Sequence, residues 1–442
     1  MTKIALSPPS GSRDFLPAEA LFRDHIFKLV KSVFSVHGYA PFETPAFERL
    51  ETLSGKYGDE GEKLIFKILK RGDKAASGEA DLALRYDLTV PTMRLYAHRR
   101  NELPRLVKRY QVAPVWRADR PGRGRFREFY QCDVDVIGSA SPLADVDVLL
   151  TLGDVLQTLG LEGFTIRLNS RQALQALMAV HNVPETLHQT VLVALDKYDK
   201  IGPDGVCAEL KVGDLPDAVS QTLIQDLESP DPELAIRSRI ESSADGKQSL
   251  LEVDAIASKI DPFLVGGKVK VDPILARGLD YYTGPIFEFV VEGSVGSIAG
   301  GGRYDGLSSL FMKESIPVCG GSLGIERIMS LVQAKNDFDP SVGALCYVTV
   351  WDEESEGTAL QLLAALHDAG VSAEIDLVGG QIGRQFKVAD ERGCRVVVVQ
   401  GPDEISAGEV AIKEMTSGMQ QTVPVSEAPA VIKDLAASLS GA

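Results

Sequence analysis

The sequence predicts a two-part molecule: an α+β domain built on an antiparallel sheet and carrying a helical insertion, followed by a small α/β domain. Three observations predict it. Paired strand patterns joined by short polar turns dominate on both sides of residues 171–259. That stretch is rich in Ala, Leu, Asp and Gln and poor in strand formers. Beyond residue 343, strand and helix patterns alternate. The expected bounds are residues 1–335 for the first domain, 171–262 for the insertion within it and 344–442 for the second domain.

The first domain begins with a helix and continues with paired strands. Apolar residues at helical spacing predict a helix over 18–37, which Gly38 ends and Pro41 and Pro45 keep from continuing. Alternating patterns predict strands at 63–70, 81–86, 107–116 and 128–137, with turns at 71–79 and 117–127. A helix at 143–160 and a strand at 164–168 precede the insertion.

Further strands are expected after the insertion, at 268–271, 286–291 and 297–298. Residues 320–330 indicate a glycine-rich turn entering a helix, and 335–343 a linker. The second domain is expected to alternate strands at 344–350, 373–376 and 395–400 with helices at 356–369, 382–392 and 429–439.

The charge composition limits the kinds of ligand that the chain is expected to bind. The net charge of −16 argues against nucleic-acid binding by the whole surface. Residues 94–127, however, hold eleven basic residues against Glu102 and Asp119. Such a run is typical of a phosphate contact or, alternatively, of a solvated basic face.

Localisation and metal content follow from the same composition. No apolar run reaches the roughly 20 residues of a membrane span, and the N-terminus lacks a signal-peptide core. A cytoplasmic protein is therefore expected. Its five scattered cysteines favour free thiols and oppose a disulfide framework or structural zinc.

Three segments suggest a site for a small polar ligand and a nucleotide. Residues 277–289 place an arginine, an aspartate and two tyrosines before a strand, although an ordinary turn is an equal alternative. Residues 117–129 place an arginine at a strand end, a flexible loop and an aromatic on the returning strand, which suits a nucleoside triphosphate. Residues 320–327 place glycines before a helix that carries Arg327. No P-loop pattern occurs, so a triphosphate site here would rest on arginines.

Three more segments carry polar residues at element ends. Asp87 and Thr89 open an expected helix, and could be no more than N-caps. Gln131, Asp133 and Asp135 alternate along one face of a strand, where buried acids need a cationic or donor-rich ligand. Residues 299–305, which include three consecutive glycines, follow an expected strand.

Together these six segments resemble the histidyl-tRNA synthetases, a family of class II aminoacyl-tRNA synthetases. Residues 11–17 resemble the family's N-terminal signature, and 117–135 and 320–327 resemble the second and third class motifs. Residues 277–283 and 299–305 resemble the two histidine-specific motifs, 194–200 the helical insertion and 344–442 the anticodon-binding domain. The resemblance covers nearly the whole length of the chain and implies a class II synthetase fold.

The resemblance also implies a reaction and its residues. A family member activates L-histidine with ATP and Mg²⁺, then transfers it to tRNA(His), and works as a homodimer. Arg277 and Arg117 would be the catalytic residues. The histidine pocket would consist of Asp87, Leu88, Thr89, Gln131, Asp135, Tyr281 and Tyr282. ATP would contact Arg117, Asp119, Arg125, Phe129 and Arg327, with Mg²⁺ as the only metal.

Two rival interpretations were open from the sequence. One is a non-catalytic, synthetase-like regulatory subunit of histidine biosynthesis, which usually lacks the C-terminal domain and an intact 277–282 segment. The other is a class II synthetase for proline or threonine, against which the two tyrosines and the lack of a zinc-ligand set argue. Asp133, Asp280 and Arg303 could equally be framework ion-pair residues and are left out of the site.

Overall fold

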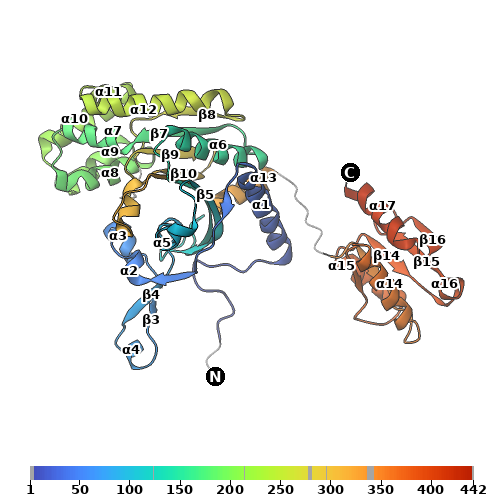
Figure 1. Ribbon diagram of the computed structural model, residues 1–442. Coiled ribbons are helices and arrows are strands. Elements are labelled where there is room, and N and C mark those ends of the chain that lie inside the picture. Colours follow the sequence, from blue (N-terminus) through green and yellow to red (C-terminus); the bar gives the residue numbers. More distant parts are fainter. Residues whose placement is uncertain are drawn as a thin grey trace. The chain divides into compact units, whose positions relative to one another are not determined.

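The computed structural model of the chain describes residues 4–122, 124–213, 215–276, 281–294, 296–335 and 343–440. The chain divides into two compact units (Figure 1). The larger unit takes residues 1–14 and 24–337, and the smaller one takes residues 15–23 and 338–442.

An eight-stranded sheet forms the centre of the larger unit. Its order is β1-β5-β6-β11-β10-β9-β7-β8, and its neighbours are antiparallel except for the β1–β5 and β7–β8 pairs. The strands are β1 (Ala40–Pro41), β5 (Val107–Trp116), β6 (Glu128–Ile137), β7 (Phe164–Ser170), β8 (Gly267–Val271), β9 (Pro285–Val290), β10 (Ala299–Arg303) and β11 (Val318–Leu323). The expected antiparallel sheet is thus confirmed.

Helices and a second, smaller sheet surround this centre. Helix α6 packs on β6, β10 and β11, and starts at the Ser141 N-cap with Pro142 in its first turn. The small sheet has the order β2-β4-β3. These elements are α1 (Pro17–Val36), β2 (Phe47–Arg49), α2 (Leu50–Leu53), α3 (Gly58–Lys63), β3 (Lys67–Leu69), α4 (Asp73–Ala76), β4 (Ala80–Leu84), α5 (Thr89–Arg99), α6 (Pro142–Thr158) and α13 (Ile325–Lys335). Short 3-10 turns lie at Arg100–Glu102, Glu185–Leu187, Asp261–Phe263 and Asp305–Leu310.

The expected helical insertion is present between β7 and β8. Figure 1 shows its helices, coloured green to yellow, gathered on one side of the sheet. Helix α12 packs on α6, α7, β7 and β8, and so fixes the insertion to the sheet. The helices are α7 (Arg171–Val180), α8 (His188–Asp196), α9 (Tyr198–Val212), α10 (Asp217–Leu227), α11 (Pro232–Glu241) and α12 (Ala244–Ile260).

The smaller unit is a mixed α/β structure, as expected. Its sheet has the order β13-β12-β14-β15-β16, parallel in its first three strands and antiparallel in the rest. Its elements are β12 (Cys346–Val348), α14 (Glu356–Asp368), β13 (Ala373–Ile375), α15 (Ile382–Glu391), β14 (Val396–Val399), α16 (Pro402–Ala407), β15 (Glu409–Glu414), β16 (Gln420–Pro424) and α17 (Ala428–Ser440). The sequence patterns did not predict α16 or the β15–β16 hairpin.

Several expected elements were wrong in detail. The strand expected at 63–70 is short, because α3 occupies its start, and α4 lies in the expected turn after it. The strand expected at 297–298 begins at Ala299, and the glycine segments 299–302 and 320–321 are strands instead of turns. Glycines lower strand propensity, so their position inside a sheet could not be inferred from the pattern. Most of the expected linker, 336–342, lies outside the described residues.

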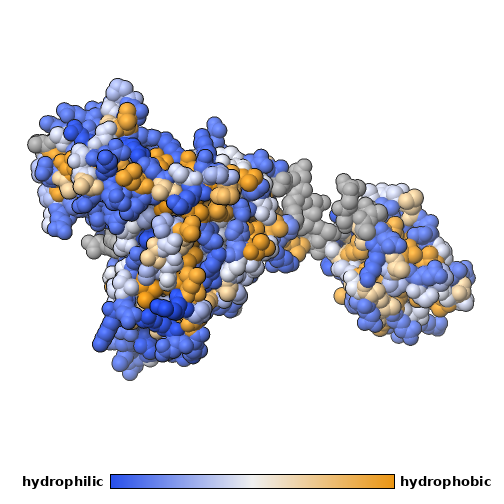
Figure 2. All heavy atoms as spheres, turned by 45° about the horizontal axis from the view of Figure 1, so that its top comes forward, coloured by the Kyte–Doolittle hydropathy of each residue, from blue (hydrophilic) through white to orange (hydrophobic). Residues whose placement is uncertain are grey.

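The surface and the helices were compared with what a membrane span requires. Hydrophilic side chains cover most of the face seen in Figure 2, with hydrophobic ones between them. Among the residues that the structure describes, no helix is long and apolar enough to cross a membrane.

Candidate active site

Two adjoining cavities open on the central sheet of the larger unit. The first has a volume of about 260 Å³ and the second about 220 Å³. Arg117, Phe129, Tyr130, Gly324 and Arg327 line both, so the two cavities share one boundary. The first is lined mainly by carboxylates, tyrosines and glycines, and the second by arginines and phenylalanines.

Strand register sets the floor of the first cavity. Arg109 of β5, Asp135 of β6, Gly320 of β11 and Gly302 of β10 lie opposite one another in a row across four strands. Side chains two residues apart share a face of a strand. The next row toward Gln131 is therefore Gln111, Asp133, Ser322 and Gly300.

Glycines in these rows leave the space that the cavity occupies. A Cβ at Gly320 would lie 2.0 Å from Asp135 Oδ1. At Gly302 it would lie 2.9 Å from the Tyr282 ring and 2.5 Å from the Pro285 carbonyl oxygen. A side chain at Gly320 would displace Asp135, and one at Gly302 would displace Tyr282 or the β9 backbone, so the two glycine segments keep the sheet surface open.

Two side chains of the protein itself offset the negative charge of the Asp135 carboxylate. The fully buried guanidinium of Arg109 lies 2.5 Å from its carboxylate. The hydroxyl of Tyr304, which follows β10, donates a hydrogen bond to Asp135 Oδ1. Burial raises the pKa of Asp135, and these two partners oppose the rise.

Asp87 enters the cavity from the start of α5. Its Oδ1 accepts hydrogen bonds from the Val90 backbone N–H at 3.1 Å and from the Tyr57 hydroxyl at 3.0 Å. The residue therefore caps the helix and also lines the cavity. Burial raises its pKa to about 6, although the cap, Arg117 and Tyr57 oppose that rise.

Three tyrosines form one wall. The ring centroids of Tyr281 and Tyr282 are 4.9 Å apart, and that of Tyr304 lies 5.7 Å from Tyr281. Burial, and then the neighbouring Tyr282 and Asp87, raise the pKa of Tyr281 well above its ordinary value. The phenol is therefore a neutral donor at physiological pH.

Arg117 stands at the boundary of the two cavities. Its Nε donates to the Tyr86 carbonyl oxygen at 3.1 Å. The guanidinium lies over the Tyr86 ring at 4.4 Å and 5.2 Å from the Phe129 ring. These contacts fix the arginine while its remaining N–H groups face the cavities, where they could bind an anion in a bidentate manner.

The second cavity combines aromatic and charged side chains. Arg125 forms an ion pair of 3.4 Å with Asp119. Arg327 Nη1 donates to the Ser297 carbonyl oxygen at 2.7 Å. Burial, with a smaller contribution from Arg125, lowers the pKa of Arg327. Phe129 and Arg327 thus offer flat surfaces suited to a planar ring.

Most residues expected in the site line these cavities, but not all. Asp87, Thr89, Arg117, Phe129, Gln131, Asp135, Tyr281, Tyr282 and Arg327 line the first, and Asp119 and Arg125 line the second. Leu88 lines neither, because its fully buried side chain turns into the core at the start of α5. Arg277 and Asp280 lie outside the described residues.

Sequence reasoning missed several residues. Tyr304, Ser322 and Gly300 line the first cavity, and Arg109 and Tyr57 hold its carboxylates. Asp133 lines the cavity too, as its place on one strand face with Gln131 and Asp135 indicated, although it was left out of the expected site because a framework role was also open. Arg303, by contrast, pairs with Asp145 at 2.5 Å and has the framework role expected of it.

Among the described residues, no group of three or more His, Cys, Asp or Glu side chains is placed to hold a metal ion.

Comparison with known proteins assigns the family. The family model "Histidyl-tRNA synthetase" matches residues 11–328, and the model "Anticodon binding domain" matches 345–435. A curated histidine–tRNA ligase from Gloeobacter violaceus is 36% identical, covering 97% of this chain and 98% of its own length.

Two solved structures share the fold. The histidyl-tRNA synthetase of Nostoc sp. PCC 7120 has a TM-score of 0.79 and 29% identity, over 98% of this chain and 100% of that one. A Bacillus halodurans protein described as an ATP phosphoribosyltransferase regulatory subunit/histidyl-tRNA synthetase has a TM-score of 0.69 and 23% identity, over 88% of this chain and 97% of that one. The second likeness concerns the fold alone. With the family model covering most of the chain and a curated relative matching along nearly its whole length, this chain belongs to the histidyl-tRNA synthetase family.

Proposed function

We propose that the two adjoining cavities are where this chain, an ATP-dependent ligase that joins histidine to its tRNA, forms histidyl-adenylate. The observation that carries the proposal is their shared boundary. A compartment of carboxylates and tyrosines meets a compartment of arginines and phenylalanines at Arg117. An amino acid in the first would have its carboxylate beside a nucleotide phosphate in the second.

The first cavity suits L-histidine. Its α-ammonium and imidazole N–H groups are donors, and the cavity offers acceptors on Asp87, Gln131 and Asp135 with phenols on Tyr281 and Tyr282. The Thr89 side chain also lines it, whereas Leu88 would contribute only through its backbone. A site built to hydrogen-bond an imidazole rejects apolar isosteres strongly, so no editing step is needed.

The second cavity suits ATP. Arg117 would hold the α-phosphate, and Phe129 and Arg327 would enclose the adenine. The Asp119–Arg125 pair would complete the contacts, Arg125 toward phosphate and Asp119 toward a donor or a cation. This arrangement uses arginines in place of a phosphate-binding loop.

The reaction follows from this placement. The histidine carboxylate attacks the α-phosphorus, and the bond to the β-phosphate oxygen breaks to release pyrophosphate. The ribose hydroxyl at the 3′ end of tRNA(His) then attacks the adenylate carbonyl carbon and releases AMP. Arg117, with Arg277 as the second catalytic residue, would stabilise negative charge at the α-phosphate during both steps.

Mg²⁺ is proposed to accompany ATP. It keeps several waters and binds through one or two carboxylates together with substrate phosphates. Asp119 and Glu326 line the second cavity and fit that requirement. When bound, the ion would neutralise phosphate charge; Arg117 and Arg125 would orient the chain of phosphates.

The finer assignments for the whole chain are also proposals. The smaller unit would recognise the tRNA anticodon, and two chains would form a homodimer that works in the cytoplasm. The regulatory-subunit alternative is opposed by the intact pocket, in which nine of the expected residues line one cavity.

ATP–pyrophosphate exchange, measured with each amino acid in turn, tests the proposal. Exchange is expected with L-histidine only. Exchange with another amino acid, or none with histidine, would contradict it. Sedimentation over a range of concentrations should give twice the chain mass. Changing Arg277 to His should abolish exchange without altering that mass.

A further inference from the structure

The three carboxylates in the first cavity differ in the ion-pair and hydrogen-bond partners that the protein provides for them. Asp135 has Arg109 and Tyr304. Asp87 receives two hydrogen bonds on Oδ1, from Tyr57 and from the Val90 N–H. Among the described residues, none donates a hydrogen bond to Asp133 Oδ1, although the side chain is only 2% exposed. A buried carboxylate oxygen of this kind calls for a donor from outside the protein.

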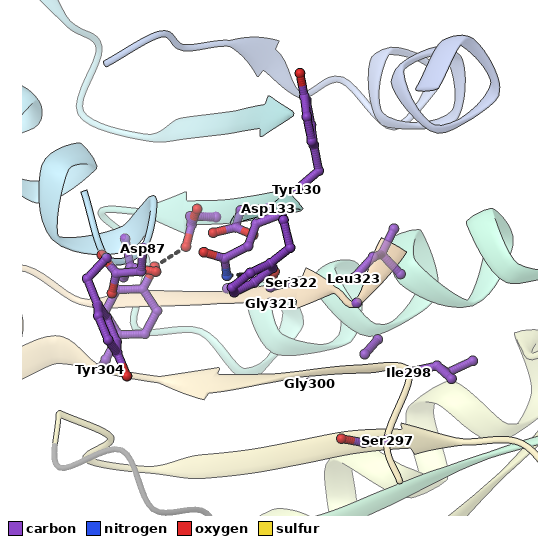
Figure 3. A pocket seen from close by; sticks show the side chains of 18 of the residues that line it. Asp87, Tyr130, Asp133, Ser297, Ile298, Gly300, Tyr304, Gly321, Ser322 and Leu323 are labelled. Carbon is purple, nitrogen blue, oxygen red and sulfur yellow. Dashed lines mark hydrogen bonds between the residues drawn. The ribbon is translucent and has the colours of Figure 1, made fainter. Parts of the chain in front are cut away.

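The neighbours of Asp133 in its row are already engaged. The Gln111 amide exchanges hydrogen bonds with the Thr44 hydroxyl. The Ser322 hydroxyl accepts from Gln131 Nε2 at 3.1 Å and also lowers the pKa of the Asp133 carboxyl, yet Oδ1 of Asp133 has no donor among the described residues. Figure 3 shows Asp133 and Ser322 side by side in the cavity lining, with Asp87 in the same lining. Asp133 is therefore held in place by its strand and open toward the cavity.

Charge balance indicates what the missing donor is. Arg109 is paired with Asp135, and Arg117 lines the boundary of the cavity; among the described residues, neither Asp87 nor Asp133 forms an ion pair of its own. Burial raises the pKa of Asp133 to about 7; Arg109 and the Ser322 hydroxyl oppose this rise, and Asp135 and Asp87 add to it. A bound cation would return both carboxylates to their ionised form.

We propose that Asp133 is a further substrate-binding residue, whose Oδ1 accepts a hydrogen bond from the α-ammonium of the amino acid opposite Asp87. The inference rests on the proposed function and deepens it. The α-ammonium is a full positive charge with three donors, whereas imidazole is mostly neutral at physiological pH.

The imidazole is placed further along β6 by the same reasoning. Asp135, two residues on and roughly 7 Å away, lies beside Tyr304 and the tyrosine wall. The ammonium then lies between Asp133 and Asp87, nearer Arg117, where the carboxylate on the same carbon must meet the α-phosphate. Asp135 orients the ring; Asp133 holds the charge.

Substituting Asp133→Asn tests this with three ligands measured by calorimetry at pH 7.5. L-histidine and L-histidinol carry the ammonium, whereas 3-(imidazol-4-yl)lactate carries a hydroxyl in its place. The variant should weaken the first two by about 10- to 100-fold and the third by less than about threefold. The wild-type affinity for L-histidine should also fall as pH drops through about 7, and this step should vanish in the variant.

A matched control separates binding from folding. Asp145→Asn removes another buried carboxylate, 3% exposed and paired with Arg303 outside the cavity. It should lower Tm without a selective loss of the ammonium ligands.

Each result decides the matter. Equal weakening of all three ligands would assign Asp133 to the imidazole and overturn the proposal. Unchanged affinities would make it a framework residue. If the wild type itself neither binds L-histidine nor catalyses exchange, the proposed function fails and this inference fails with it.

Discussion

At the scale of single residues, the charged side chains of the site differ in how deeply the fold buries them. Arg109 is fully buried and neutralises Asp135 inside the protein. Arg117 is fixed by the Tyr86 carbonyl and ring but keeps donors free for a ligand. The same side-chain type therefore serves structure in one place and chemistry in the other, and only burial and partners distinguish them.

Arg117 should not tolerate even a conservative change. In Arg117→Lys, the charge remains but the planar, bidentate donor set is lost. Exchange kcat should fall by about 100-fold or more, as for loss of one preorganised donor to a developing anion, while KM for histidine changes little. Arg99→Lys is the control, since Arg99 forms only an exposed pair with Glu102. A full-rate Arg117 variant would remove this residue from the mechanism.

The pH dependence should carry opposite signs for binding and for folding. The pKa of Asp87 is raised to about 6 and that of Asp133 to about 7, because burial disfavours their charged forms. Acidification from pH 8 to 6 should therefore raise KM for histidine. The ligand-free fold, in contrast, loses stability from these groups as pH rises from about 4, the ordinary Asp pKa, through 7.

Thermal unfolding measures the second effect. The Asp133→Asn variant has no charge to bury, so its Tm should exceed that of the wild type most at pH 8. That gap should shrink as the pH falls below about 7 and should close only near pH 4, the ordinary Asp pKa. A gap that is constant with pH would mean that Asp133 does not titrate with a raised pKa in the folded chain.

At the scale of elements, the sequence was informative wherever apolar alternation was strong. The β5–β6 pair was predicted with its bounds. Val107–Trp116 buries alternate residues over much of its length, whereas the last six residues of Glu128–Ile137 are all buried. The pattern failed at β10 and β11, whose runs Ala-Gly-Gly-Gly-Arg and Val-Cys-Gly-Gly-Ser-Leu have weak strand propensity. Long-range pairing makes them strands, and their small residues make the cavity.

The candidate site, like the strands, was predicted from the sequence only in part. Strand spacing placed Gln131, Asp133 and Asp135 on one face, as the cavity lining requires. The sequence could not tell that Arg109 and Tyr304, distant along the chain, would pair with Asp135 and leave Asp133 open. Partner identity depends on register between strands, which local pattern does not contain.

A glycine in β11 should be essential for its lack of a side chain. In Gly320→Ala, the new Cβ would meet Asp135 Oδ1 and the Val134 carbonyl oxygen at 2.0 and 2.6 Å. The strand or the carboxylate must move, so Tm should fall. Overpacking costs about 1–3 kcal/mol, so if this cost falls on the pocket, histidine binding should weaken about 5- to 150-fold.

Gly357→Ala provides the comparison for Gly320. A Cβ there meets nothing within 4 Å, and Gly357 lies in the first turn of α14. This change should be neutral or stabilising by up to about 1 kcal/mol. Equal effects of the two substitutions on histidine binding would oppose the spatial role given to Gly320.

At the scale of the whole molecule, fewer basic side chains are available to bind a ligand than the sequence suggests. Of the ten basic residues between Arg94 and Arg127 that the structure describes, six form ion pairs with carboxylates of the chain. The basic run is therefore in large part a framework feature of an acidic protein. Sequence-specific contact with tRNA is better sought in shaped sites, including one on the smaller unit.

The smaller unit offers such a site at the ends of its parallel strands. Trp351 follows β12, the middle strand of the parallel set, and is 46% exposed. The Gln385 amide fixes the preceding backbone, accepting from Val350 N–H at 2.9 Å and donating to the Val350 carbonyl oxygen at 2.7 Å. An exposed indole on a fixed backbone at this edge suits stacking with an unpaired base.

Trp351→Ala should therefore separate the two reactions. Base stacking on an aromatic is worth about 1–3 kcal/mol, so KM for tRNA(His) in aminoacylation should rise about 5- to 150-fold. Histidine-dependent ATP–pyrophosphate exchange, which needs no tRNA, should stay at the wild-type rate. Leu360→Ala is the control, because Leu360 is 53% exposed on α14 and lacks a ring to stack. Loss of exchange in the Trp351 variant would show that the indole supports the catalytic reaction instead of tRNA recognition, and unchanged KM would exclude it from the RNA contact.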